Sequence, residues 1–335
     1  MVATGQATTP GAAHRIHSAA FWRAYGVTMR PYLCFVSGSA GLVGLALAHG
    51  VGQSASAAAF AALFLTYGLG QALTDVFQTD TDALSSPYRP LTQGRITRAQ
   101  VLAISLTGLG ACGLVLAALS LWTLPLSALG AAGLLTYTWF KRRWWGGPLW
   151  NSWVVALLPA IGYLAGGGSP RALGTDHLLW AAMVSVLFSY AVFVLLGYFK
   201  DISADRATGY RTLVVVAGWR TATWVSFGFG LIAVAASAWL VSSLGGFDGA
   251  GGPSLAVALP LWLAGAASLL GAHPYMLRLR GEREAHRAIT WTVRGFVLLH
   301  LGESVVALST LALPALLYYA LFELVLARRP ERSQV

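Results

Sequence analysis

Five aspartates in two short stretches are the residues of this sequence best suited to chemistry. Three of them lie in "TDVFQTDTDAL", directly after an apolar run, and two lie in "KDISADRATG", after another apolar run. A carboxylate at membrane depth costs on the order of a few kcal/mol unless it is paired, so such residues favour a functional interpretation. Mg²⁺ is held by one or two carboxylates together with substrate phosphates. The two stretches therefore predict a magnesium-dependent site.

The spacing of these acids predicts two acidic helix faces. Steps of three, four and seven residues nearly complete whole helical turns, so Asp75 and Asp82 share one face of a continuous helix and Asp201 and Asp205 share another. Asp80 points roughly opposite to Asp75, which fits a solvated position or a contact with the cap. The expected metal ligands, with one neutral amide oxygen among them, are Asp75, Gln78, Asp82, Asp201 and Asp205.

Cationic side chains accompany both acidic stretches. Of the 22 Lys and Arg residues, only Lys141 and Lys200 are lysines, and both fall beside these segments. A lysine is a compact charge suited to a phosphate oxygen, whereas arginine offers a planar fork of donors. Acids for a metal ion and cations for an anion, next to apolar helices, indicate an amphiphilic ligand with a phosphorylated head. The cations expected to contact this head are Arg30, Arg89, Lys141, Lys200, Arg206 and Arg211.

Solvation and membrane topology offer a simpler explanation of the same residues. Carboxylates at a helix end can be solvated, and Lys and Arg in these loops are expected from topology alone. This explanation weakens because two acidic turns on the same side of the membrane are each followed by a basic segment. It also leaves "PYRPL" and "GYRTL" without an explanation, although both are turn sequences at similar offsets after the acidic turns.

The elements that must position these residues are membrane helices. The chain has 335 residues, of which 56% are hydrophobic and only 10% charged, whereas a soluble domain carries about 25% charged residues. Its apolar stretches approach the roughly 20 residues that a helix needs to cross the hydrocarbon. We therefore predict an all-α, polytopic bundle of nine to ten spans. The ten stretches are 31–50, 56–78, 100–120, 122–140, 149–167, 178–199, 222–243, 255–276, 290–307 and 309–327.

The basic residues predict the orientation of this bundle. With ten spans, all Lys and Arg residues except Arg171 fall on one side, together with both termini. The positive-inside rule places that side, with the motif loops, in the cytoplasm of a cell-membrane protein. The net charge of +10 is then explained by topology and requires no nucleic-acid partner. A nine-span alternative would fuse 290–327 into one helix of about 57 Å, far longer than a ~30 Å hydrocarbon core.

The domain organisation predicted from the sequence is simple. Residues 1–25 are expected to form a disordered N-terminal tail without a cleavable signal, because the polar flank of the first span lacks a small-residue cleavage site. Residues 26–330 are expected to form a single transmembrane domain, since no change in composition divides the membrane region.

The acidic stretches resemble the motifs of the UbiA superfamily of intramembrane prenyltransferases. Members of that family have Asn-x3-Asp-x3-Asp after the second helix, leading into Arg-Pro-Leu, and Asp-x3-Asp after the sixth, leading into Gly-x2-Thr-Leu. The segments "DVFQTDTDALSSPYRPLTQGRI" and "DISADRATGYRTLVVVAG" carry this layout, and the family's Tyr-x3-Lys is matched by Tyr137 and Lys141. The resemblance covers roughly residues 25–275.

The resemblance implies a fold and a reaction. The fold is a bundle of transmembrane helices around a central cavity, closed by cytoplasmic cap loops. The reaction is Mg²⁺-dependent transfer of a prenyl group from a prenyl diphosphate to a lipophilic acceptor, aromatic or quinone-like, within the membrane lipid. The resemblance implies that Asp75, Asp82, Asp201 and Asp205 are catalytic through the metal. It also implies that the cations named above contact the diphosphate and that Tyr137 orients Lys141 or the diphosphate.

The sequence departs from the family pattern in its first motif. Counted back from Arg89, the three motif positions are Thr74, Gln78 and Asp82, so the usual Asn is a threonine, next to Asp75, and the middle Asp is Gln. Fewer carboxylates imply a weaker or differently placed magnesium ion. Two alternatives to the transferase remain open: a terpene cyclase on the same scaffold, and a non-enzymatic carrier of a phosphorylated lipid.

Overall fold

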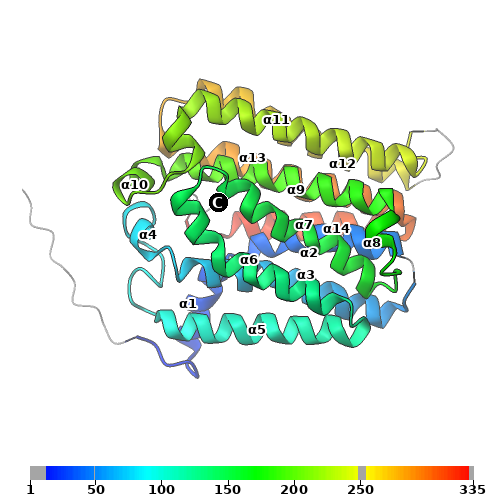
Figure 1. Cartoon of the computed structure of the whole chain (residues 1–335), viewed down its shortest axis with the longest axis horizontal. Coiled ribbons are helices and arrows are strands. Elements are labelled where there is room, and N and C mark those ends of the chain that lie inside the picture. The colour runs from blue at the N-terminus through cyan, green and yellow to red at the C-terminus, as the bar shows by residue number, and fades with distance from the viewer. Residues whose placement is uncertain (1–12, 49, 248–253, 332–335) are drawn as a thin grey trace, which may run out of the picture.

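The computed structural model of the chain describes residues 13–48, 50–247 and 254–331, and every regular element in these ranges is helical. In chain order the elements are α1 (Ala19–Met29), η1 (Pro31–Leu33), α2 (Cys34–Ala48), α3 (Gln53–Asp75), α4 (Thr79–Ser85), α5 (Arg98–Leu119), α6 (Thr123–Arg143), α7 (Gly147–Ala165), α8 (Ala172–Thr175), α9 (His177–Gly197), η2 (Tyr198–Lys200), α10 (Ile202–Ala207), α11 (Leu213–Ser243), α12 (Leu255–Arg278), η3 (Glu282–Glu284), α13 (His286–Ala307), η4 (Ser309–Leu311) and α14 (Ala312–Ala327). Figure 1 shows the long helices side by side in one bundle.

Each of the ten predicted apolar stretches contains one long helix of the bundle. In the described part of the chain, eight of these helices are long and apolar enough to cross a membrane, and α6 and α13 are not among the eight. Both nevertheless connect the two ends of the bundle. The start of α13 follows Glu282, which accepts hydrogen bonds from Ser203 of α10, while Val306 near its end faces the loop after α11. The all-α class is therefore as predicted, and in the described part of the chain each predicted stretch corresponds to one long helix.

The last two helices form a hairpin, so the fused helix of the nine-span alternative does not occur. The backbone leaves the helical region at Leu308, where φ is −141° and ψ is 97°. On either side of this break, Arg294 Nε donates to Glu323 Oε1 at 2.6 Å. This ion pair joins α13 to α14 at equal distance from the turn, as antiparallel neighbours require.

Part of the segment predicted as a disordered N-terminal tail is helical. Residues 1–12 lie outside the described residues, but Ala19 begins α1, so the last part of the segment 1–25 is helical. The reason is local. The side chain of Ser18 caps the helix by accepting from the backbone N–H of Phe21, and Phe21 and Tyr25 are buried against the bundle.

Small residues bring the helices into close contact. A side chain at Gly44 would collide with the backbone of Pro159, and one at Gly162 would collide with the backbone of Gly41, so α2 and α7 pack backbone to backbone. Gly265 and its partners make the same kind of contact between α12 and α13. Lipid tails provide no hydrophobic force between helices, and small residues at interfaces allow the close packing that replaces it.

A buried polar network also joins α9 to α13. Ser185 donates to Glu303 Oε1 at 2.8 Å, and Ser189 Oγ lies 3.0 Å from His300 Nε2. The Nδ1 atom of His300 lies 2.8 Å from Glu303 Oε2. All four side chains are buried and none lines the large cavity described below, so this network positions helices.

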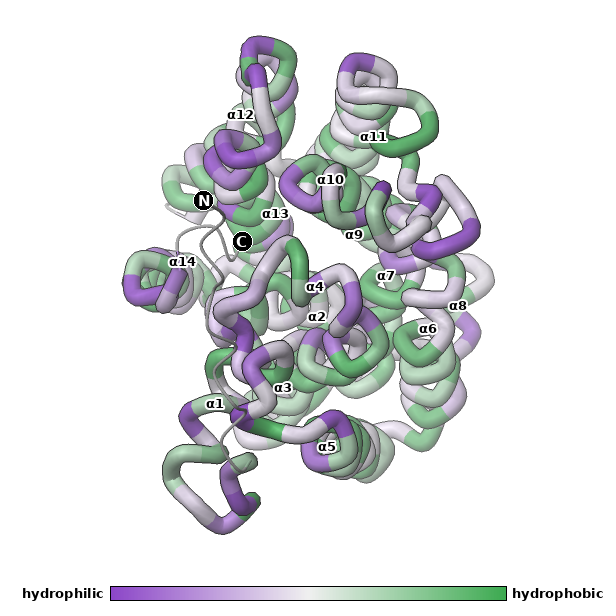
Figure 2. Tube along the Cα trace, turned by 90° about the vertical axis from the view of Figure 1, so that its left-hand side faces the viewer, coloured by the Kyte–Doolittle hydropathy of each residue, from purple (hydrophilic) through white to green (hydrophobic). Residues whose placement is uncertain are grey.

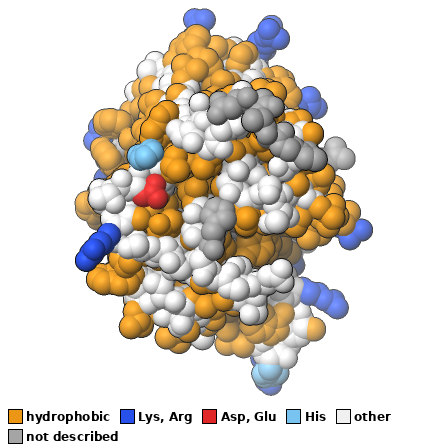
Figure 3. Space-filling view, turned by 90° about the vertical axis from the view of Figure 1, so that its right-hand side faces the viewer, with side chains coloured by type: hydrophobic (Ala, Val, Ile, Leu, Met, Phe, Trp, Pro, Cys, Tyr) orange, Lys and Arg blue, Asp and Glu red, His pale blue; other side chains and the backbone are white. Residues whose placement is uncertain are grey.

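The two acidic segments lie at the same end of the bundle, which we call the cap end. It carries α4 and α10, drawn together at the left of Figure 1, and Figure 2 shows hydrophilic residues gathered in its loops. Figure 3 shows that the opposite end presents mainly hydrophobic and uncharged side chains.

The continuous helix predicted through Asp75 and Asp82 is wrong. The structure ends α3 at Asp75 and restarts the chain at Thr79 as α4, with Gln78 between them at φ −119°. The N–H groups of Phe77 and Gln78 bond to carbonyls three residues back, which tightens the last turn and redirects the chain. The acids of this segment are brought together by tertiary contacts rather than by a shared helix face.

Candidate active site

A cavity of about 480 Å³ runs from the cap end into the bundle. Side chains from α2, α3, α5, α6, α7 and α9 line it. Its inner walls are mostly leucine, valine, alanine and glycine, and its charged lining residues all come from the cap end. These charged residues are Arg30, Asp75, Asp82, Arg89, Lys141, Lys200 and Asp201.

Two arginines hold the carboxylates of the first acidic segment. Arg30 Nη2 donates to both oxygens of Asp75, at 3.1 and 2.8 Å. The Nη1 atom of Arg89 lies 3.7 Å from Asp75 Oδ1 and forms a close ion pair with Asp82 Oδ2. A single guanidinium thus reaches both Asp75 and Asp82, which places the two carboxylates at one point of the cavity mouth.

The backbone of Arg30 is strained to make this contact. With φ 52° and ψ 72°, Arg30 is the one non-glycine residue of positive φ in the described ranges. It ends α1 and precedes Pro31, which starts η1. A non-glycine residue held in this region costs about 1–3 kcal/mol and persists only where surrounding contacts determine it. The buried ion pair with Asp75 is such a contact.

Burial and the neighbouring opposite charge have opposing effects on the pKa values of Asp82 and Arg89. Burial raises the pKa of the Asp82 carboxyl, and the nearby charge of Asp75 raises it further, while Arg89 lowers it. For Arg89, burial lowers the pKa, but the carboxylates of Asp82 and Asp75 outweigh it and hold the pKa above its ordinary value. A site in which two arginines face two carboxylates is suited to a ligand that brings both positive and negative charge.

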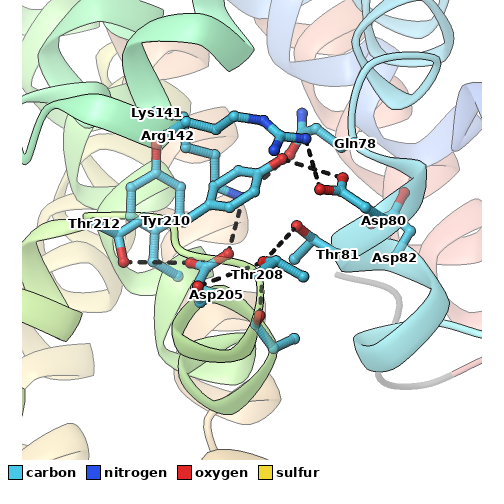
Figure 4. A network of polar contacts seen from close by, with 12 residues as sticks. Gln78, Asp80, Thr81, Asp82, Lys141, Arg142, Asp205, Thr208, Tyr210 and Thr212 are labelled. Carbon is cyan, nitrogen blue, oxygen red and sulfur yellow. Dashed lines mark hydrogen bonds and ion pairs between the residues drawn. The ribbon is translucent and has the colours of Figure 1, made fainter.

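Lys141 connects the two acidic segments. Its Nζ atom donates to Gln78 Oε1 at 3.1 Å and lies 3.6 Å from Asp205 Oδ1 (Figure 4). The ammonium also lies 5.0 Å from the ring of Tyr198 and 5.1 Å from that of Tyr210, within cation–π distance. The hydroxyl of Tyr137 lies 2.9 Å from that of Tyr198, so Tyr137 orients Lys141 only indirectly, through Tyr198.

The two acids of the second segment have different surroundings. Asp201 is half-buried and lines the cavity. Asp205 is fully buried beside Lys141 and accepts a hydrogen bond from Thr212 at 3.3 Å. Burial raises the pKa of Asp205 to about 6, against the opposing effect of Lys141. The backbone bond from Asp205 N to Asp201 O, 2.7 Å long, confirms the predicted single turn between the two acids.

Side chains outside the cavity fasten the two cap helices to each other and to α6. Arg142 donates to Asp80 Oδ2 at 2.7 Å and stacks 4.5 Å from the ring of Tyr210. The hydroxyls of Thr81 on α4 and Thr208 after α10 lie 3.2 Å apart (Figure 4). Burial raises the pKa of Asp80, but bonds from the Thr81 N–H and from Arg142 hold the pKa below its usual value.

Two of the predicted diphosphate contacts are not brought into the cavity. Arg206 and Arg211 are exposed and absent from its lining. Arg206 follows Asp205, whose side chain points inward, and so lies about 100° further round the short helix α10. Arg211 follows Tyr210, which is buried, and its backbone N–H bonds to the carbonyl of Arg142. Both side chains therefore point away from the site.

Several polar residues of the site were missed from the sequence. Gln71 donates to Asp75 Oδ1 at 2.8 Å from one turn earlier in α3, a contact that its spacing could have revealed. Tyr190 pairs with Tyr67 at 2.8 Å across the cavity. The amide of Asn151 donates to Tyr190 at 3.4 Å. These last contacts join three different helices, and no local pattern indicates them.

The residues at the cavity mouth fit a magnesium ion that is bound together with a diphosphate. Within the described ranges, no three His, Cys, Asp or Glu side chains are close enough to hold a metal by themselves. Mg²⁺, however, is usually held by one or two carboxylates plus substrate phosphates. Buried atoms without a hydrogen-bond partner in the described part of the chain include the Nε atoms of Arg30 and Arg89. Such donors require a partner, which phosphate oxygens supply. Asp205 does not line the cavity, and its Oδ1 atom faces Lys141 Nζ at 3.6 Å.

The fold and the sequence both match known proteins. Residues 37–275 match the UbiA prenyltransferase family. A digeranylgeranylglyceryl phosphate synthase from Natronomonas pharaonis is 32% identical over 216 residues, which are 62% of this chain and 74% of that protein.

Two solved structures are similar throughout most of the chain. A UbiA homologue from Aeropyrum pernix has a TM-score of 0.68 at 21% identity, covering 80% of this chain and 96% of that one. A UbiA homologue from Archaeoglobus fulgidus, bound to GPP and Mg²⁺, has a TM-score of 0.57 at 15% identity, covering 82% of this chain and 99% of that one. With the family match, these likenesses identify the chain as a multi-pass membrane protein and a member of the UbiA prenyltransferase family of enzymes.

Proposed function

We propose that this protein catalyses the Mg²⁺-dependent transfer of a prenyl group from a prenyl diphosphate to an acceptor in the membrane. One observation carries the proposal: the two acidic segments and four cationic side chains meet at the mouth of an apolar cavity. The four cations are Arg30, Arg89, Lys141 and Lys200. A prenyl diphosphate has a matching division into a charged head and an apolar tail.

The chain's own residues bind and orient the diphosphate. Arg89 and Arg30 each have a buried Nε donor without a partner in the described ranges, and both line the cavity. Lys141 lies between the two acidic segments, where it reaches a bridging or terminal phosphate oxygen. When bound, magnesium neutralises the charge that develops on the leaving group. Asp75, Asp82, Asp201 and Asp205 would hold it, with Gln78 as a neutral oxygen ligand.

The reaction breaks one bond and forms one. The allylic carbon–oxygen bond breaks, and its electron pair leaves with the diphosphate. Preorganised donors stabilise that developing charge most effectively where water is excluded. Tyr67 and Tyr190 line the cavity just inside the charged mouth, and aromatic faces stabilise an allylic cation. A nucleophilic atom of the acceptor then bonds to the cation, and its proton passes to the departing diphosphate.

The relatives bear on the acceptor. Their name, digeranylgeranylglyceryl phosphate synthase, states a product with a glyceryl phosphate head, whereas the sequence predicted an aromatic or quinone-like acceptor. We propose a prenylated glyceryl phosphate as the acceptor, because the cavity mouth already gathers cations for phosphate groups. An aromatic acceptor is the alternative. The positive-inside rule supports a cytoplasmic position for the cap end, where water-soluble pyrophosphate is released.

The test is pyrophosphate release by the purified full-length protein with prenyl diphosphate, Mg²⁺ and each acceptor class. Release that depends on a prenylated glyceryl phosphate, with mass spectrometry showing the joined product, supports the proposal. Pyrophosphate release that depends only on an aromatic acceptor would assign that class of acceptor to the enzyme instead. A hydrocarbon product formed without any acceptor would identify a terpene cyclase instead.

A lipid carrier is distinguished from an enzyme by the effect of replacing the acids of the site. Asp82→Asn and Asp201→Asn remove metal ligands, so the enzyme is expected to lose about 10²-fold or more in turnover for each, comparable to removing one preorganised group that stabilises a transition state. Unchanged behaviour of both variants without Mg²⁺ would favour a non-enzymatic carrier.

A further inference from the structure

Three uncharged polar side chains from three different helices form a chain of hydrogen bonds within the apolar part of the cavity. Asn151 Nδ2 of α7 donates to the hydroxyl of Tyr190 on α9 at 3.4 Å, and that hydroxyl lies 2.8 Å from the hydroxyl of Tyr67 on α3. All three residues line the cavity. Asn151 is the only asparagine of the chain, and polar groups inside a membrane protein are costly unless they are paired.

The hydrogen bonds of this chain leave two groups without a partner. While Asn151 donates to Tyr190, Tyr190 donates its own proton to Tyr67, and the proton of Tyr67 then has no acceptor among the described residues. The Oδ1 atom of Asn151 likewise accepts no hydrogen bond in the described part of the chain. The opposite orientation of the amide reverses the chain and again leaves one donor and one acceptor unpaired. Such groups need a partner, so the chain fits a ligand group that both donates and accepts.

The depth of Asn151 in the cavity corresponds to the reacting carbon of a bound prenyl diphosphate. A Cβ on Gly147, at the start of α7, would lie 2.9 Å from the hydroxyl of Tyr198 and 3.4 Å from the Cα atom of Lys141. Asn151 follows Gly147 by one helical turn, about 6 Å along the axis. Helical side chains lean toward the N-terminal end of their helix, which for α7 is the cap end. The amide therefore lies just inside the cation assigned to the diphosphate, where the prenyl group begins.

The chemistry of the unpaired groups distinguishes between the possible occupants of this position. A prenyl tail has no hydrogen-bonding group, and an ionised diphosphate accepts hydrogen bonds but donates none. A hydroxyl group both donates and accepts. The hydroxyl of the acceptor is therefore the group that matches the chain, and it has to lie next to the first prenyl carbon in order to react.

We propose that Asn151, together with Tyr67, binds the nucleophilic hydroxyl group of the acceptor beside the first carbon of the prenyl donor. The inference rests on the proposed function and names the site for its second substrate. The hydroxyl donates to Asn151 Oδ1 and accepts from Tyr67, which leaves a lone pair of its oxygen for the new bond. Neither residue takes a proton. The bonds made and broken are those of the proposed reaction, and the acceptor proton still passes to the diphosphate.

The experiment combines a change in the protein with a change in the acceptor. The acceptor is a monoprenylated glyceryl phosphate, which has one free hydroxyl, and its deoxy analogue carries hydrogen in place of that hydroxyl. Equilibrium binding of each is measured with the full-length protein in lipid nanodiscs, saturated with Mg²⁺ and a non-ionisable prenyl thiolodiphosphate. Wild type is expected to bind the acceptor about tenfold more tightly than the deoxy analogue, the range of one or two hydrogen bonds. Asn151→Leu is expected to bind the two compounds with affinities equal to within about twofold.

Ser152→Ala is the matched control. Ser152 is the next residue of α7, is buried, donates to the carbonyl of Pro148 at 2.6 Å and does not line the cavity. This variant is expected to keep the tenfold preference for the hydroxyl.

Turnover provides a second measurement. Asn151→Leu is expected to raise KM for the acceptor about tenfold and to change KM for the prenyl diphosphate by less than about twofold. Because the prenyl cation then reacts more often with water, the proportion of prenyl alcohol among the products should rise. A residue that only packs α7 against its neighbours would not separate the two KM values in this way.

The binding data decide between the outcomes. Equal affinity of wild type for the acceptor and its deoxy analogue, or no binding of either, would overturn the inference. A preference that persists in Asn151→Leu, or that Ser152→Ala abolishes as well, would also overturn it. If wild type shows the expected preference but releases no pyrophosphate from any prenyl diphosphate, the proposed function fails and the hydroxyl site stands.

Discussion

Lys141 donates a 3.1 Å hydrogen bond to Gln78, and this contact joins the end of α6 to the segment between α3 and α4. The same ammonium lies 3.6 Å from Asp205 on α10. Three regions far apart in the sequence therefore meet at one buried cation. A diphosphate bound at the cavity mouth would meet that cation and both acidic segments at once.

Replacing this cation should slow the chemical step. Lys141→Met removes a preorganised positive charge from a water-poor site, and the expected loss in kcat is about 10²–10³-fold. The neighbouring Arg143→Met is the matched control, since Arg143 is exposed and stacks on Trp139 at 4.7 Å outside the cavity. Steady-state pyrophosphate release measures both. Equal losses of kcat in the two variants would show that removing any positive charge from α6 slows the reaction, so that Lys141 has no specific role.

The neutral side chain of Gln78 is expected to make Mg²⁺ binding weaker than a carboxylate at the same position would. Gln78→Asp adds a carboxylate beside Asp75 and Asp82, and it is expected to lower the half-saturating Mg²⁺ concentration by about tenfold, which corresponds to about 1.4 kcal/mol. Gln78→Asn, of the same size as Asp and uncharged, controls for side-chain length. Titration of pyrophosphate release with Mg²⁺ gives the constants. Tighter magnesium in the Asn variant would assign the change to geometry instead of charge.

The contacts of the cap should affect substrate retention more than chemistry. Asp80 and Arg142 are partly exposed, and exposed ion pairs contribute about 0.2–1 kcal/mol. Asp80→Asn and Arg142→Met are therefore each expected to raise KM for the diphosphate by about two- to fivefold, with kcat nearly constant. A double-mutant cycle tests whether they act together. Strictly additive effects would mean that the ion pair does not fasten the cap.

The pH dependence of metal binding should show the ionisation of the Asp205 carboxyl group. Its pKa is raised to about 6 in the folded protein, above the ordinary value near 3.9. Because the folded pKa is raised, the stability that Asp205 contributes is fully present below about pH 4 and is lost as pH rises through about 6. Magnesium binds the ionised carboxylate, so metal affinity is expected to fall by up to about tenfold per pH unit below about 6.

The Asp205→Asn variant is the control for that pH profile. Its half-saturating Mg²⁺ concentration should be higher than that of wild type at pH 7 and should vary less between pH 7 and 5. The metal-free wild type should gain thermal stability over the variant on acidification through the same range. A wild-type profile without any change near pH 6 would contradict the assignment of Asp205.

The sequence predicted the helices better than the short segments between them. Long apolar stretches specify their own conformation in a bilayer, because every backbone polar group must be satisfied within the helix. Asp75 and Asp82 were expected on one continuous helix, but the chain turns at Gln78. The direction of Arg206 and Arg211 was likewise missed. Such short segments are determined by tertiary contacts, here those of Arg89, Lys141 and Arg142, which local periodicity does not contain.

The central claim is that both acidic segments hold one metal–diphosphate cluster at the cavity mouth. It is tested most directly by electron paramagnetic resonance of Mn²⁺ bound to the full-length protein with a non-ionisable prenyl thiolodiphosphate. The account predicts analogue-dependent Mn²⁺ binding that is lost in Asp82→Asn and equally in Asp201→Asn. Each variant removes one ligand of the same cluster, and the two ligands come from different acidic segments. Mn²⁺ binding that persists unchanged in either variant, or that needs no analogue, would contradict it.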